Sequence, residues 1–206
     1  MSSSLAGEQE RLEARAEAVL AGVPSFVWDG ESLPVPVEDI ADSCFGLLIR
    51  SEPDPSLAPG APQLPAGQAL SGLLLADRGE IWVNAEEARE WPGRRRFTIG
   101  HELGHWVLHR PVPEPQHAAG QESVFCRRGA VCEDCDRDAL ATAHSGIPVA
   151  EQEANVFAAA LLMPARLVGE HYDRSQPDYF ERLCRLFEVS GAAMGRRLHS
   201  AVPRQR

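Results

Sequence analysis

The fold is decided by one stretch of the chain, Arg94-Arg95-Arg96-Phe97-Thr98-Ile99-Gly100-His101-Glu102-Leu103-Gly104-His105-Trp106-Val107-Leu108-His109-Arg110. Its centre is a His-Glu-x-x-His motif at positions 101–105. Residues four apart share one face of a helix, so His101 and His105 direct two imidazoles toward one point. Two imidazoles placed in this way suit two positions of a tetrahedral zinc site. Glu102 lies one residue round from the first histidine, where its carboxylate can take a proton from an attacking water.

The residues around the motif predict a helix. An apolar stripe runs along one side of it, and Pro111 ends the segment soon after His109. Thr98 is one candidate for the N-cap, and a start one turn earlier fits the pattern equally well. The three arginines before the motif are interpreted as a solvated approach to the helix in preference to a contact with an acidic substrate. The alternative to a metal site is a core helix with two hydrogen-bonded histidines, so a third ligand is needed.

A second long helix, predicted for Glu151–Met163 and ended by Pro164, offers that ligand. At 100° per residue, Glu151 lies about 60° from the centre of its apolar face and Glu153 about 100°. A glutamate near the buried face is the better ligand, which favours Glu151. Glu153 is the fallback and is otherwise a solvated residue. His101, His105 and Glu151 with one open position form the catalytic arrangement of zinc ligands and not the structural one.

Composition and charge narrow the class of protein. The 206 residues are 44% hydrophobic and 24% charged, which is typical of a globular protein with a real core. The net charge of −10 argues against nonspecific nucleic-acid binding as the main role. There is no run of about 18 apolar residues and no signal-peptide pattern at the N-terminus, so we expect a cytoplasmic protein without membrane contact. Five cysteines, an odd number, suit a reducing compartment.

The remaining elements predict an α+β fold with a small antiparallel sheet. Two apolar runs, 71–76 and 81–84, flank a turn that contains Gly79 and read as a hairpin. Two short C-terminal helices, from about 177 to 187 and from 191 to about 201, are joined by a tight turn and resemble a helix-turn-helix. At this net charge, packing is favoured over direct DNA binding for them. Further elements are predicted as a surface helix over 8–21, a helix over 37–44 and a strand over 45–50.

Three cysteines lie in an irregular, polar stretch between Pro111 and Glu151, namely Cys126, Cys132 and Cys135. Cys132 and Cys135 form a Cys-x-x-Cys pair, which raises the question of a second, structural zinc. Structural sites normally have four ligands, and the fourth would have to come from His117, His144 or another group. We therefore favour reduced thiols over a second metal.

The two central motifs resemble the ImmA/IrrE family of zinc metallo-endopeptidases. The resemblance is carried by Arg96 to His105 and by Glu151-Gln152-Glu153-Ala154-Asn155-Val156-Phe157-Ala158-Ala159-Ala160-Leu161-Leu162-Met163-Pro164. It implies a zincin-like domain over residues 1–170, with 112–150 as an insertion, and a C-terminal helical extension over 171–206. It also implies that His101, His105 and Glu151 bind zinc and that Glu102 is the catalytic base.

Members of this family cleave helix-turn-helix repressors and so relieve repression, and the resemblance implies such a repressor as the partner here. Two other classes stay open, a non-catalytic zinc-bound regulatory module of transcription and a housekeeping peptidase for short peptides.

An oxyanion-stabilising group is expected, and His144, His171 and Tyr172 are its candidates. We expect His109 to be a cation at the C-terminus of the helix that carries the His-Glu-x-x-His motif.

Overall fold

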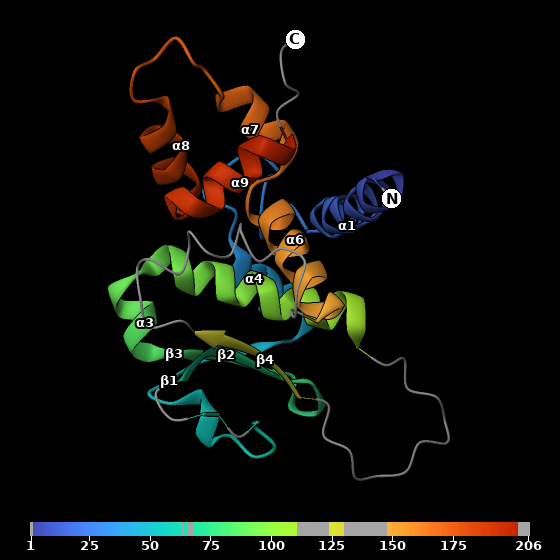
Figure 1. Ribbon diagram of the computed structural model, residues 1–206, viewed down its shortest axis with the longest axis vertical. Helices are drawn as coiled ribbons and strands as arrows, with labels where there is room; N and C mark the ends of the chain where they lie inside the picture. Colours follow the sequence, from blue (N-terminus) through green and yellow to red (C-terminus); the bar gives the residue numbers. More distant parts are fainter. Residues whose placement is uncertain (1, 63, 66–67, 111–123, 130–147, 202–206) are drawn as a thin grey trace.

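The computed structural model describes residues 2–62, 64–65, 68–110, 124–129 and 148–201 (Figure 1). Its elements are, in chain order, α1 (Ser2–Ala21), α2 (Val37–Phe45), β1 (Leu48–Glu52), η1 (Pro55–Leu57), β2 (Ala69–Leu75), η2 (Ala76–Arg78), β3 (Glu80–Asn84), α3 (Ala85–Glu90), α4 (Pro92–His109), β4 (Val124–Gly129), α6 (Val149–Leu162), α7 (Ala165–His171), α8 (Tyr179–Phe187) and α9 (Gly191–Ala201).

The sheet has four strands in the order β1-β3-β2-β4. The α+β prediction is confirmed, but the predicted antiparallel sheet is wrong in one pair, because β1 and β3 run parallel. The other two pairs, β2 with β3 and β2 with β4, are antiparallel. The reason is the path of the chain. The chain leaves β1 and passes the position of β3 before it enters β2, and it then turns back to form β3 between them. Strand β1 therefore lies beside β3 and runs in the same direction.

The predicted hairpin is present as β2 and β3, joined by η2 and by Gly79 in the left-handed region at φ +63°. Its first strand contains a bulge, because the register with β4 shifts between Leu70 and Gly72. One extra residue reverses the alternation of side chains along the strand. Leu74 therefore joins the main core on the α4 face, whereas Leu70 and Leu73 are buried on the opposite face.

The two faces of the sheet are covered differently. Helix α4 crosses one face, and α6 lies on the far side of α4 from the sheet (Figure 1). The segment around η1 covers the other face, where Ala58 packs with the leucines of β2 in a second, smaller apolar cluster. Helix α4 is therefore sandwiched between a sheet and a helix, which accounts for the complete burial of Ile99 and Leu103.

Helices α4 and α6 approach each other closely because small residues face one another. Gly100 and Gly104 are one turn apart on α4, and Ala158 and Ala154 are their neighbours on α6. A Cβ atom added at Gly104 would lie 3.2 Å from both the Cα and the carbonyl oxygen of Ala154. The absence of a side chain at this position therefore sets how near the two helix backbones come.

The basic start of α4 is structural. The helix begins at Pro92, earlier than the motif alone requires, so Thr98 is not its cap. Nε of Arg95 donates to Glu38 over 2.8 Å, and Arg96 donates to the carbonyl oxygen of Val35 over 2.6 Å. Burial lowers the pKa of Arg96 below its ordinary value. The interpretation of this stretch as a solvated approach was wrong, since these arginines fasten α4 to α2 and to the segment before it.

The C-terminal helices pack onto the main core. Leu183 and Phe187 of α8 and Met194 of α9 are fully buried in the same apolar cluster as Ile99 of α4. Ser190 caps α9 by accepting from the backbone N–H of Ala193 over 3.2 Å. The likeness of this pair to a helix-turn-helix and the domain boundary between residues 170 and 171 stay predictions.

None of the helices in the described ranges has the length and apolar character that crossing a bilayer requires.

The close approach of α4 and α6 can be tested with Gly104→Ala and Gly100→Ala, which add the same methyl group one turn apart. Both gain alanine's helix propensity of about 1 kcal/mol, so this term cancels between them. The nearest atom to a new Cβ is 3.2 Å away at position 104 and 3.5 Å away at position 100. We expect Gly104→Ala to be less stable than Gly100→Ala by about 1–3 kcal/mol in denaturant unfolding. Equal stabilities would contradict the tight contact.

Candidate metal centre

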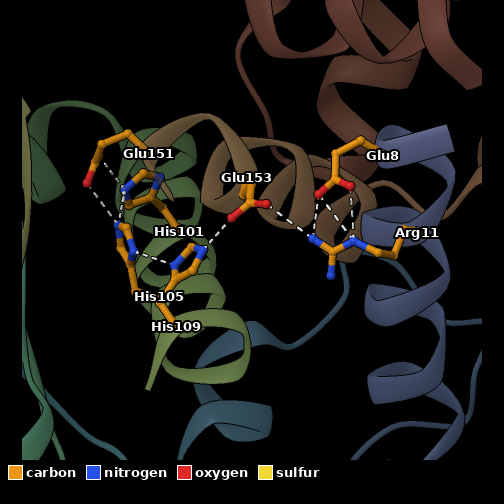
Figure 2. A network of polar contacts seen from close by, with 7 residues as sticks. All are labelled: Glu8, Arg11, His101, His105, His109, Glu151 and Glu153. Carbon is orange, nitrogen blue, oxygen red and sulfur yellow. Dashed lines mark hydrogen bonds and ion pairs between the residues drawn. The ribbon is translucent and has the colours of Figure 1, made fainter. Parts of the chain in front are cut away.

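Three side chains converge between α4 and α6. His101 and His105 are fully buried on α4, and the side chain of Glu151 at the start of α6 is 26% exposed. Nε2 of His101 lies 3.2 Å from Glu151 Oε2, and Nε2 of His105 lies 3.1 Å from Glu151 Oε1. The two Nε2 atoms are 3.1 Å apart. Figure 2 shows the three groups pointing toward one another.

This donor set fits a metal ion. Ligand atoms of the three residues lie within 4.8 Å of one another, an arrangement that could hold a cation. With zinc–ligand bonds of 2.0–2.1 Å, neighbouring donors of a tetrahedral site are about 3.3 Å apart. The separations of 3.1–3.2 Å are close to that value. Two imidazoles and a carboxylate with one position left open are the donors of a catalytic zinc site, which contributes Lewis acidity when the metal is bound.

The protonation of the donors agrees with this interpretation. Nδ1 of His101 lies 3.1 Å from the amide oxygen of Asn155, which accepts, so Nδ1 carries the hydrogen and Nε2 of the neutral ring has the lone pair. Burial raises the pKa of Glu151, but its contacts with His101 and His105 outweigh burial and lower the pKa to about 2. In that state protons on the facing imidazoles stabilise the carboxylate; a bound cation would replace these protons and take the carboxylate oxygen and the Nε2 lone pairs of the neutral rings as donors.

The proposed base, Glu102, is fully buried on the sheet side of α4. It lies opposite Gly72 of β2, where an added Cβ would be 3.2 Å from Glu102 Oε1 and would collide with Cγ2 of Thr98. The bulge in β2 brings Gly72 to this face. Because Gly72 has no side chain, the backbone of β2 can lie close to α4 and still leave space for the carboxylate of Glu102.

The structure separates the two glutamates that the sequence offered as third ligand. Glu151 reaches the histidine pair, whereas Glu153 contacts His109, with 2.7 Å between Oε2 and Nε2. Glu153 is therefore not the solvated residue of the alternative interpretation. His109 in turn contacts the ring of His105. From the sequence we expected a cation at the helix terminus and did not predict this contact. The spacing of four residues between His105 and His109 was the available signal.

Other candidates lie elsewhere. Cys132, Cys135, His117 and His144 are outside the described residues, and Cys126 belongs to β4, whose side chains are not described. The prediction of reduced cysteines and no second metal stays a prediction. The rings of His171 and Tyr172 pack against Phe187 and Tyr179, in the C-terminal part of the fold.

Residues 137–199 match the family model of the IrrE N-terminal-like domain, Peptidase_M78. This match points to a metallopeptidase. The predicted resemblance to the ImmA/IrrE family is thereby confirmed, over a segment that contains Glu151 but not the His-Glu-x-x-His motif. A comparison with curated proteins gave no match.

The ligand set predicts one zinc ion per chain for the group His101, His105 and Glu151. Replacing any of the three by alanine removes a donor, so we expect the zinc content of each purified variant to fall far below one equivalent. Glu153→Ala should still take up a full equivalent at saturating zinc. Metal analysis of the four variants decides between the glutamates, because retention by Glu151→Ala together with loss in Glu153→Ala would reverse the assignment.

Proposed function

We propose that this protein is a zinc-dependent endopeptidase of the cytoplasm that cleaves one specific protein, a helix-turn-helix transcriptional repressor, and so relieves repression. The observation that carries the peptidase part is the convergence of two buried imidazoles and one anionic carboxylate beside a second, buried carboxylate, Glu102. A purely structural zinc site has no use for such a base, which disfavours a non-catalytic zinc-bound module. The repressor as substrate rests on the resemblance to the ImmA/IrrE family.

The residues divide the chemistry between them. Zinc held by His101, His105 and Glu151 would polarise the scissile carbonyl and lower the pKa of the attacking water toward about 7. Glu102 accepts the proton of that water and then delivers it to the nitrogen of the departing amine. The peptide C–N bond breaks as the new C–O bond forms, and the products are a carboxylate and an amine. Burial between α4 and β2 keeps Glu102 fixed for both transfers.

The role of Glu102 is tested by Glu102→Gln, which keeps the shape of the side chain and removes its ability to take up a proton. We expect this variant to fold and to bind a full equivalent of zinc. Its cleavage rate should fall by about 10²–10⁴-fold, the usual contribution of a general base. Cleavage at the wild-type rate would remove Glu102 from the mechanism.

An extended substrate segment can bind by adding a strand to the sheet. The hairpin itself has no open edge, because β2 and β3 each have a neighbour on both sides among the described strands. Of the described strands, β1 and β4 form the edges, and β4 contacts α4 more extensively than β1 does. We therefore assign the substrate segment to the outer edge of β4. Backbone hydrogen bonds there would select an extended, exposed linker and little of its sequence.

Selectivity then requires docking of the folded partner on another surface, for which the C-terminal helices and the 112–150 insertion are the candidates. We expect the intact repressor encoded beside this protein to be cut at one site, and a synthetic peptide of the cut linker to be a much poorer substrate. Mass spectrometry of both digests under identical conditions measures this difference. The full-length chain is used, because α8 and α9 contribute Leu183, Phe187 and Met194 to the core.

Glu102→Gln serves as the control in both digests and should cut neither substrate. Equal cleavage of peptide and repressor would contradict docking and would favour a housekeeping peptidase for short peptides.

A further inference from the structure

A line of polar contacts leads away from the metal centre through three helices. Nδ1 of His105 lies 3.1 Å from Nδ1 of His109 on α4, and Nε2 of His109 lies 2.7 Å from Oε2 of Glu153 on α6. The other oxygen of Glu153 accepts from Arg11 of α1 over 3.1 Å. Figure 2 shows this line, with Glu153 between His109 and Arg11 and with Glu8 beside Arg11.

With His109 neutral, the Glu153 carboxylate at the end of the line sets the direction of each hydrogen bond. A carboxylate only accepts, so Nε2 of His109 donates to Glu153. A neutral imidazole that donates through Nε2 accepts at Nδ1, and Nδ1 of His105 must therefore donate to it. His105 is then left with its lone pair on Nε2, the atom that faces Glu151 and His101. The line thus selects the tautomer of His105 that can bind a metal.

Burial separates the inner part of this line from its outer end. His105 is fully buried, and the side chains of His109 and Glu153 are only 15% and 18% exposed. Hydrogen bonds at such positions hold a ring in place more firmly than exposed ones do. Arg11 is 57% exposed, and an ion pair of that kind contributes little. The orienting effect should therefore reside in His109 and Glu153.

We propose that His109 and Glu153 are positioning residues of the metal centre, which hold the imidazole of His105 in the tautomer and orientation that present Nε2 to the ion. This proposal rests on the proposed function in that His105 is taken as a zinc ligand. Glu153 is thereby an outer carboxylate that supports a ligand and is not a ligand itself. Partners of this kind typically change metal affinity by about 10–100-fold.

The test is the dissociation constant for zinc, measured on the metal-free full-length protein by competition with a chromophoric chelator. We expect His109→Phe, which keeps a ring without nitrogen atoms, and Glu153→Ala to raise the constant about 10–100-fold. Glu153→Gln retains a carbonyl oxygen that can accept from His109, so it should recover a large part of the affinity. The double variant of His109→Phe and Glu153→Ala should be no weaker than the weaker single variant, because both changes interrupt the same line.

Two controls separate this role from a general loss of structure. Glu170→Ala removes an exposed carboxylate that pairs with Arg166 on α7, and Arg11→Ala removes the exposed end of the line. Both should bind zinc within about 3-fold of the wild type, since exposed pairs are weak. Thermal unfolding of the metal-free variants reports any structural damage independently of zinc.

The outcomes are distinct. If the wild type takes up no zinc, the proposed function itself fails. If the wild type binds zinc and His109→Phe and Glu153→Ala bind it equally well, only the positioning role is overturned. Weaker binding that merely follows the loss of thermal stability, without recovery in Glu153→Gln, would also overturn it.

Discussion

The structure depends on the contact between α4 and α6. Because Gly104 has no side chain, the backbone at Ala154 comes within van der Waals distance of α4, and Gly100 meets Ala158 one turn away. Only at this spacing does Glu151, at the start of α6, reach the imidazoles of His101 and His105. A bulkier interface would separate the carboxylate from the histidines and leave two buried imidazoles without their anion. The packing of α4 on α6 and the assembly of the candidate metal site therefore place one and the same constraint on the sequence.

The surroundings of the two helices serve the same centre. On one side of α4, the bulge in β2 turns Gly72 toward the helix and leaves room for the carboxylate of Glu102. On the α6 side, Glu153 connects His109, the third histidine of the series on α4, to α1 through Arg11. Arg95 and Arg96 hold the start of α4 against α2 and the segment before it. These polar contacts are arranged around one helix, α4, and fix its position from several directions.

The local periodicity of the sequence was enough to predict the histidine pair, the third ligand candidate and the hairpin. The spacing of four between His101 and His105, and the angle of Glu151 from the apolar face of α6, follow from helix geometry alone. The hairpin followed from Gly79 between two apolar runs. The parallel pairing of β1 with β3 could not be predicted. It depends on which side of the hairpin β1 joins, and the sequence of the segment between β1 and β2 does not determine this. The contacts of Glu153 with His109 and Arg11 join residues far apart in sequence, and no local pattern shows which carboxylate a neighbouring helix will meet.

The central claim is that one metal ion is bound by His101, His105 and Glu151, with Glu153 outside its coordination sphere. Anomalous diffraction from crystals of the zinc-loaded protein, recorded on both sides of the zinc absorption edge, tests it directly. The account predicts a single strong peak per chain between α4 and α6, about 2.0–2.2 Å from Nε2 of both histidines and from a carboxylate oxygen of Glu151. A peak bound to Glu153, or zinc found only at the cysteines, would contradict it.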